Sequence, residues 1–399
     1  MESPKHEDGG FTTLISAIRK AMCGEKIQRE EFRDILNYLW DKSPQGIKLS
    51  GPRLLMKLLR DPAFLLSLPT FAMIMGTHIT PEVLCGLYDS MKNHGLYRED
   101  DTPHKVPHVV SGTGTGGKEI PTINVSTASA IIAASAGGTV LRSGTRGFFS
   151  SSGASDFLKA SNIPRISELA LVEPMVRTTG LAFIEGEAFS PLSHYIKPMT
   201  RTQRDMQVLI KALAPPFRLA TALLKPLGSD YAHRGIILPV TREVAEALRL
   251  YRGFKRGIVV FGKDNDGRSF DEFSNVGPNE VSDFDADGVR TFTLWPQDVG
   301  LPLRQTKEIE IDDKHQRYMV TTEVLRGRRG KGDPFAELLA FNAGSVLYAG
   351  GFVRDIGEGV EKCLAAIMGG LPYEVIEKYR QAYSQLSCTL VERNKGNYR

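Results

Sequence analysis

The chain has few cysteines, no long apolar run and little excess charge of either sign. Its four cysteines lie far apart and form no CxxC pair: Cys23, Cys85, Cys363 and Cys388. This spacing argues against a disulfide framework or a zinc site and favours reduced thiols, as in a cytoplasmic protein. The longest apolar stretch, near 128–141, is interrupted by serine and paired glycines and is too short to span a bilayer. We therefore expect no membrane association.

The composition is that of a soluble globular protein. Of the 399 residues, 41% are hydrophobic and 24% are charged, and the net charge is only +4, which anionic small molecules would suit as well as nucleic acid. The basic cluster Arg326–Lys331 is interpreted as a solvated loop, so nucleic acid is not the favoured partner. The polar residues 1–10 are expected to form a flexible tail rather than a signal peptide. A chain of this length favours two domains.

The pattern of apolar residues changes near residue 105. Before that point, apolar residues recur at helical spacing, and Thr80 followed by Pro81 predicts the start of a helix. After it, short apolar runs alternate with helices rich in small residues, as in an α/β layer. The candidate strands are 106–110, 139–141, 235–238 and 257–261, followed by a hairpin within 281–295 and helices from Asp333 onward.

A glycine-dense stretch, Gly112–Gly117, is the most informative local feature. Its sequence is GTGTGG, and it lies between a candidate strand and the small-residue segment Asn124–Ala134. Glycines permit a tight turn and close approach of a ligand to the backbone N–H groups. The following helix would direct its positive end towards the same place. The stretch therefore predicts a site for an anion such as a phosphate group.

A second candidate phosphate loop spans Arg142–Asp156. It supplies two arginines, several hydroxyl groups and three glycines between a candidate strand and a helix. Guanidinium and backbone N–H groups bind phosphate oxygens well. The alternative is that Ser151 or Ser152 only caps the helix that begins near Gly153. Two such loops in succession favour a ligand with more than one phosphate.

An adjacent acidic pair, Asp271 and Glu272, follows the candidate strand 257–261. Mg²⁺ prefers oxygen ligands and commonly shares them with substrate phosphates, so the pair is a candidate magnesium site. On its own, such a pair is more often part of a solvated surface. The segment Asp283–Gly288 has the opening spacing of a calcium-binding loop, but Leu294 stands where a glutamate is needed, and a hairpin is favoured instead.

These motifs together resemble the anthranilate phosphoribosyltransferase family and, more distantly, the pyrimidine nucleoside phosphorylases of the same fold. The family pattern is a GTGG loop, then N-[IV]-S-T-A-S, then K-H-G-N-R with a serine-rich tail. Gly114–Gly117 matches the first motif, Asn124–Thr127 the second, and Arg142–Asp156 stands in place of the third. The likeness extends through nearly the whole chain. It implies a glycosyltransferase that moves a phosphoribosyl group.

The resemblance implies an α/β fold in which a small all-helical domain is joined to a larger α/β domain with a central, mostly parallel sheet. The helical domain would comprise 11–104 with about 192–227, and the phosphoribosyl-binding domain 105–191 and 228–390. The active site would lie in a cleft whose closure excludes water. Family members commonly pair through the helical domain, so a homodimer is expected.

The resemblance also implies roles for individual residues. The donor would be phosphoribosyl pyrophosphate, accompanied by Mg²⁺ at Asp271 and Glu272, and the acceptor a small aromatic molecule. No protein nucleophile is expected, because positioning and charge stabilisation suffice. Pyrophosphate and ribose would be held by Gly114, Thr115, Gly116, Gly117, Asn124, Ser126 and Thr127, phosphate by Arg142, Gly144, Thr145 and Ser152, and the acceptor by His194 and Lys211.

The chain departs from the family pattern at several of these positions. Lys118 stands where the family has aspartate after GTGG, and Arg142–Thr145 replaces the K-H-G-N run. An arginine that the family directs at the anthranilate carboxylate corresponds to Ala212, beside Lys211. The acceptor therefore stays open: anthranilate or a related aromatic or heteroaromatic acid. Two alternatives also stay open: a nucleoside phosphorylase that uses phosphate, and a non-catalytic nucleic-acid-binding relative.

Overall fold

The computed structural model describes residues 9–41, 74–94, 106, 108–144, 154–186 and 218–396. The chain divides into two compact units, one formed by Met1–Glu99 with Phe189–Leu224 and the other by Asp100–Ala188 with Lys225–Arg399. Much of the segment before residue 105, for which helices are expected, lies outside the described residues. No helix in the described ranges combines the length and the apolar character needed to cross a membrane.

The first unit contains the helices α1 (Gly9–Cys23), α2 (Arg29–Asp41) and α5 (Pro81–Asn93). Helix α5 begins as the sequence predicts, because the Thr80 hydroxyl accepts a hydrogen bond from the backbone N–H of Val83. Helices α2 and α5 pack closely at Gly86, where a Cβ atom would lie 2.6 Å from the carbonyl oxygen of Arg29. The Arg29 guanidinium also forms a two-pronged ion pair with Asp89 of α5.

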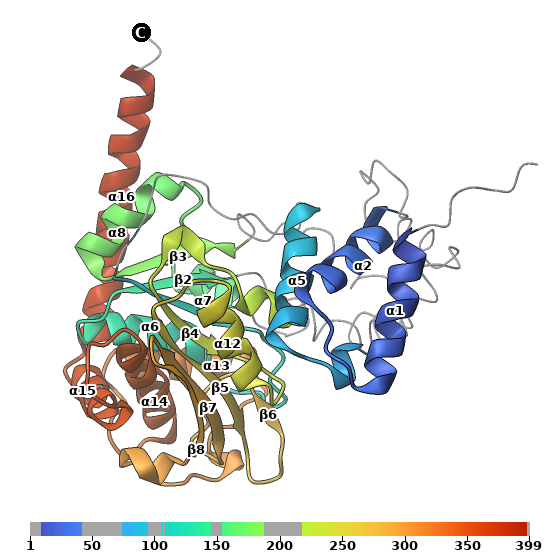
Figure 1. The fold of residues 1–399 in the computed structure, drawn as a ribbon. Helices are drawn as coiled ribbons and strands as arrows, with labels where there is room; N and C mark the ends of the chain where they lie inside the picture. The colour runs from blue at the N-terminus through green and yellow to red at the C-terminus, as the bar shows by residue number, and fades with distance from the viewer. Residues whose placement is uncertain are drawn as a thin grey trace, which may run out of the picture. The chain divides into compact units, whose positions relative to one another are not determined.

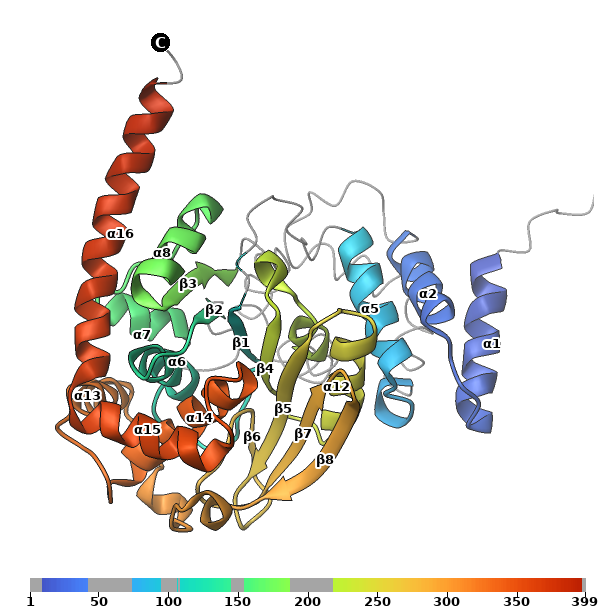
Figure 2. The ribbon, with the colours of Figure 1, turned by 60° about the vertical axis from the view of Figure 1, so that its left-hand side comes forward.

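The second unit is built around one sheet (Figures 1 and 2). Within the described residues the sheet has eight strands in the order β3-β2-β1-β4-β5-β7-β8, with β6 also paired to β5. The five strands from β3 to β5 run parallel, whereas β6, β7 and β8 pair antiparallel. The α/β class with a mostly parallel sheet is therefore confirmed. The strands are β1 (Val110–Gly114), β2 (Val140–Gly144), β3 (Leu181–Glu185), β4 (Tyr231–Gly235), β5 (Arg256–Lys263), β6 (Ser269–Phe270), β7 (Asn279–Asp285) and β8 (Gly288–Leu294).

Helices cover the sheet because their apolar faces pack against its buried strands. Helices α6 and α14 pack on each other and contact the strands β1, β2, β4 and β5, while α12 contacts β5 and β7 (Figure 2). The long helix α16 contacts α6 and α8. The remaining helices of this unit are α6 (Val125–Ser135), α7 (Ala154–Ala160), α8 (Val172–Thr179), α12 (Thr241–Leu250), α13 (Lys314–Leu325), α14 (Pro334–Ala349), α15 (Ile356–Met368) and α16 (Leu371–Gly396).

Two strands lie at positions other than those the sequence predicts. The expected strand 106–110 is in fact β1, which begins at Val110 and runs into the glycine stretch, because β2 and β4 pair with it on both sides. Those ladders satisfy the backbone of the glycines in an extended form. The expected strand 235–238 is in fact β4, which ends at Gly235. The sequence of β4, YAHRG, is too polar to predict a buried strand.

The other local predictions agree with the structure. The hairpin within 281–295 is present as β7 and β8, which are joined through Ala286 and Asp287. Helix α14 is capped by the Asp333 side chain, which accepts from the N–H groups of Phe335 and Ala336. In the basic segment after α13, Arg329 forms ion pairs with Glu323 and Asp333.

Gly235 is expected to be essential to the packing of this unit. A Cβ atom on it would lie 1.6 Å from the carbonyl oxygen of Asp271, whereas one on Gly112 would meet only the flexible Arg142 side chain at 3.6 Å. The substitution Gly235→Ala should therefore lower the free energy of unfolding by about 3 kcal/mol or more, since the backbone must move. The control Gly112→Ala should cost about 1 kcal/mol or less. Urea unfolding measures both; equal stability of the two variants would contradict the close approach.

Candidate active site

The predicted site segments converge at the carboxyl ends of β1 and β4. The sheet order reverses between these two strands. From β1 the chain adds β2 and β3 on one side, and then places β4 and β5 on the other side of β1. In open α/β sheets such a switch point is where ligands bind. The two candidate phosphate loops begin on neighbouring strands, with Gly112 in register with Arg142. The acidic pair follows β6, and its backbone lies directly over Gly235.

The glycine loop is hydrogen-bonded to the end of β4 and to the segment that carries the acidic pair. The N–H of Thr115 donates to the carbonyl of Gly235, and the N–H of Glu119 donates to the carbonyl of Ser269. The Glu119 carboxylate accepts in return from the N–H and the hydroxyl of Ser269. Between these ties the chain turns through Gly116 and Gly117, which have φ of 72° and 100°, a conformation that favours glycine.

The N–H groups of this loop and of the α6 N-terminus contact the protein's own carboxylates. The N–H of Gly116 donates to Asp271 Oδ2 at 2.6 Å, and the N–H of Ser126 donates to Glu272 Oε1 at 3.1 Å. The Lys118 ammonium donates to Glu272 Oε2 at 3.0 Å. The positive end of α6 stabilises the negative charge of Glu272, and the loop N–H of Gly116 stabilises that of Asp271. From the sequence, phosphate oxygens rather than carboxylates were expected at these N–H groups.

Burial raises the pKa of Asp271 to about 6, and the neighbouring charge of Glu272 acts in the same direction. Lys118, the N–H of Gly116 and Arg142 oppose this rise. Both carboxyl groups are almost fully buried, at 5% and 6% exposure. The acidic pair is thus no solvated surface, and its charge depends on the cations around it.

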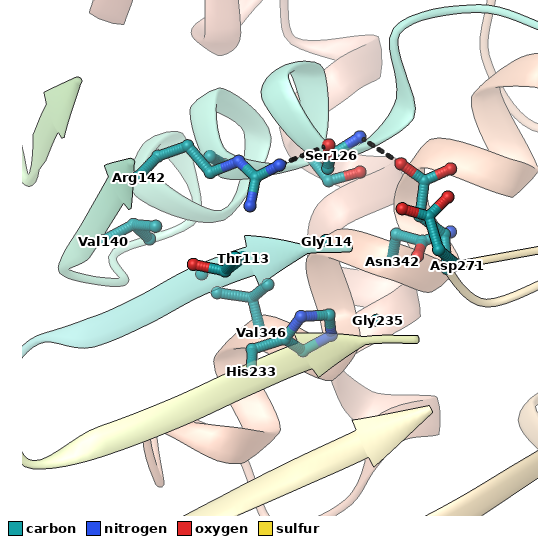
Figure 3. A pocket seen from close by; sticks show the side chains of 14 residues that line it. Thr113, Gly114, Ser126, Val140, Arg142, His233, Gly235, Asp271, Asn342 and Val346 are labelled. Carbon is teal, nitrogen blue, oxygen red and sulfur yellow. Dashed lines mark hydrogen bonds between the residues drawn. The ribbon is translucent and has the colours of Figure 1, made fainter. Parts of the chain in front are cut away.

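Arg142 lies within β2 and points across β1 towards the start of α6, where its guanidinium donates to Ser126 Oγ at 2.7 Å (Figure 3). Burial lowers its pKa, while the charges of Glu272 and Asp271 raise it. Within the described residues, three buried polar atoms of the site make no hydrogen bond: Arg142 Nε, Asn124 Nδ2 and Thr115 Oγ1. Buried polar groups without partners are uncommon and call for a ligand or a water molecule.

A small pocket lies beneath these groups. Its volume is about 20 Å³, enough for a water molecule. It is lined by the described site residues Gly114, Ser126, Arg142, Asp271 and Glu272, together with His233 and Asn342 (Figure 3). Thr127 is buried within α6 and is not part of this lining. Thr145, Ser152, His194 and Lys211 lie outside the described residues, and Gly144 ends β2.

Two pocket residues were not predicted from the sequence. His233 Nε2 donates to Ser345 Oγ at 2.8 Å, because that hydroxyl in turn donates to the carbonyl of Asn342 at 2.7 Å. The Asn342 side chain holds the backbone of Phe273 on both sides, accepting from its N–H and donating to its carbonyl. Asn342 therefore fixes the residue that follows the acidic pair. The sequence does not indicate His233, because the predicted strand 235–238 begins after it, whereas β4 contains it.

The acidic pair offers the donor chemistry that Mg²⁺ requires, namely two adjacent buried carboxylates. No group of three or more His, Cys, Asp or Glu side chains suited to a metal ion occurs in the described parts of the chain. Because Mg²⁺ takes six ligands and is commonly held by one or two carboxylates plus substrate phosphates, the pair fits an ion that a phosphorylated ligand helps to coordinate.

Comparison of the chain with known proteins identifies the class of enzymes to which it belongs. Residues 106–373, more than half of the chain, match the family described as "Glycosyl transferase family, a/b domain". The class is thus that of glycosyltransferases, as the sequence predicts. The anthranilate phosphoribosyltransferase of Exiguobacterium sibiricum is 30% identical over 77% of this chain and 84% of its own length. That of Methanopyrus kandleri is 27% identical over 91% of this chain and 98% of its own. The chain belongs to the anthranilate phosphoribosyltransferase family, whose members are pentosyltransferases.

Solved structures of this family share the fold. Anthranilate phosphoribosyltransferase from Thermus thermophilus aligns with a TM-score of 0.67 at 22% identity, over 92% of this chain and 98% of that one. The enzyme from Saccharomyces cerevisiae, in complex with PRPP and Mg, aligns with a TM-score of 0.70 at 19% identity, over 94% and 98%. At these identities the likeness supports the fold alone.

The buried His233 predicts a specific pH dependence of stability. Burial, together with the charges of Arg142 and Arg234, lowers its pKa from 6.5 to about 3. Below pH 6.5 the unfolded chain therefore binds a proton that the folded chain does not. As a result, the free energy of unfolding decreases as the pH is lowered. Between pH 7.5 and 5, wild type should lose about 2 kcal/mol more than His233→Gln. Urea unfolding of both proteins at the two pH values measures this difference; equal losses would mean that His233 is protonated in the folded state.

Proposed function

We propose that this protein is a Mg²⁺-dependent phosphoribosyltransferase. It moves a 5-phosphoribosyl group from phosphoribosyl pyrophosphate to an aromatic acceptor and releases pyrophosphate. The acceptor is anthranilate or a related aromatic or heteroaromatic acid. Support comes from the family to which the chain belongs and from the names of its relatives, which are anthranilate phosphoribosyltransferases.

One observation carries the proposal: buried hydrogen-bonding atoms without partners gather beside a buried acidic pair. Among the described residues, Asn124 Nδ2 and Arg142 Nε are donors with no acceptor, and Thr115 Oγ1 can donate as well. All three residues are at most 9% exposed. Donors of this kind suit the oxygens of ribose and phosphate, and the carboxylates suit the cation that accompanies a polyphosphate. Opposite charges are thus presented side by side, as a metal–polyphosphate complex requires.

In the reaction, an acceptor atom displaces pyrophosphate from C1 of the ribose. Positive charge develops on the sugar and negative charge on the leaving group. The Arg142 guanidinium stabilises that negative charge electrostatically, and its hydrogen bond to Ser126 Oγ fixes its direction. Gly114–Gly117 leave room for the leaving group close to the backbone.

Asp271 and Glu272 are the residues that hold Mg²⁺ in this proposal. When bound, the ion supplies charge neutralisation of the pyrophosphate and so makes it a better leaving group. The protein keeps the carboxylates in place through the N–H groups of Gly116 and Ser126. Further support comes from the Saccharomyces cerevisiae enzyme, whose structure is a complex with PRPP and Mg.

Other expectations remain predictions. These are the homodimer, the cytoplasmic location, the domain boundaries near 104, 192 and 227, and the roles of His194 and Lys211 towards the acceptor. The phosphorylase alternative is distinguished by its ligand, because it would prefer ribose 1-phosphate to the pyrophosphorylated sugar. The nucleic-acid-binding alternative would bind neither sugar phosphate.

Calorimetric titration tests the proposal. Phosphoribosyl pyrophosphate should bind in the presence of Mg²⁺ and weaken at least about tenfold in EDTA, because the ion bridges the phosphates and the acidic pair. The double substitution Asp271→Ala/Glu272→Ala should remove this Mg²⁺ dependence. Product formation with anthranilate and other aromatic acids, followed by loss of the acceptor, then identifies the acceptor.

The matched control is Glu361→Ala/Glu374→Ala, which removes two exposed carboxylates from α15 and α16. It should bind the donor as wild type does. Tighter binding of ribose 1-phosphate than of phosphoribosyl pyrophosphate would favour the phosphorylase. Absence of binding to either ligand, or a Mg²⁺ effect that survives loss of Asp271 and Glu272, would contradict the proposed function.

A further inference from the structure

Lys118 forms an ion pair with one member of the acidic pair. Its ammonium donates to Glu272 Oε2 at 3.0 Å and to the carbonyl of Ile123 at 3.3 Å. The side chain of Lys118 is 23% exposed and that of Glu272 is 8% exposed, so the ion pair is largely shielded from water. Under such conditions Coulombic attraction is much stronger than at the surface. The family pattern has an aspartate at this position, so the charge here is reversed.

The charges of the site balance without any metal ion. Two carboxylates, Asp271 and Glu272, face two cations, Lys118 and Arg142. Both oxygens of Glu272 already accept hydrogen bonds, one from Ser126 N–H and one from Lys118. One oxygen of Asp271 accepts from the N–H of Gly116. The site therefore has no net negative charge to attract a free divalent cation. In addition, the Lys118 ammonium occupies the place beside Glu272 Oε2 where such a cation would bind.

We propose that, in the free protein, Lys118 is a built-in cation that takes the place of a divalent ion at Glu272. This proposal rests on the proposed function and concerns the metal requirement of that same site. In the free protein the ammonium neutralises Glu272 and repels a metal ion that arrives alone. A divalent ion then binds only together with a polyphosphate, whose negative charges overcome the repulsion and complete the coordination shell. Lys118 is thus a residue that determines metal affinity and makes it depend on the donor.

The consequence differs between the free protein and its complex. Wild type should bind free Mn²⁺, a spectroscopic substitute for Mg²⁺, only weakly. Removal of the positive charge should expose Glu272 to the metal and strengthen that binding. Replacement by aspartate adds a third carboxylate and should strengthen it further. A substitution that keeps the charge should change little.

The experiment measures free Mn²⁺ by electron paramagnetic resonance during titration of the whole protein, without and with phosphoribosyl pyrophosphate. Lys118→Met removes the charge at similar length, Lys118→Asp reverses it, and Lys118→Arg retains it. Without the donor, Lys118→Met should bind Mn²⁺ at least about tenfold more tightly than wild type, and Lys118→Asp more tightly again. Lys118→Arg should match wild type. Lys118→Gln, which also removes the charge, replaces Lys118→Met if circular dichroism shows that Lys118→Met has not folded.

Three results would overturn the proposal. One is tight binding of free Mn²⁺ by wild type, and another is equal Mn²⁺ affinity in Lys118→Met and Lys118→Arg. The third is a gain in Lys118→Met that persists when Asp271→Ala/Glu272→Ala is added, because the metal would then bind elsewhere. Failure of the proposed function is separate, because it is read from donor binding by wild type, whereas the Lys118 series is read from metal binding in the absence of donor.

Discussion

The contact between the Asp271 backbone and Gly235 is the constraint on which the site depends. A side chain at position 235 would occupy the space of the Asp271 carbonyl, so the loop after β6 can cross the end of β4 only because that residue is glycine. The crossing brings Asp271 and Glu272 to the glycine loop and to the start of α6, where N–H groups stabilise their charge. The carboxylates are therefore held by backbone geometry.

Charge balance is the second property of this site. Burial alone would favour the neutral form of a carboxyl group, and it raises the pKa of Asp271 to about 6. Lys118 and Arg142 counteract this from two different elements, one from the glycine loop and one from β2. Lys118 stands where the family pattern has an aspartate, so the charge beside the acidic pair is reversed.

Much of the fold and part of the site could be predicted from the sequence. The hairpin, the Thr80 cap, the helix from Asp333 and the α/β class depend on local patterns, which short segments encode. The limits of β1 and β4 could not be predicted, because glycine and polar residues enter strands only when neighbouring strands pair with them. His233 was missed for the same reason. The ion pair of Lys118 with Glu272 joins residues that lie far apart in the chain, which no local pattern indicates.

The most direct test of the central claim is a crystal structure with phosphoribosyl pyrophosphate and Mn²⁺. We predict an anomalous peak within about 2.5 Å of a carboxylate oxygen of Asp271 or Glu272, shared with pyrophosphate oxygens that lie against Gly114–Gly117. Arg142 should contact the ligand in the same structure. A ligand or a manganese ion bound away from the carboxyl ends of β1 and β4, with the acidic pair unchanged, would contradict the claim.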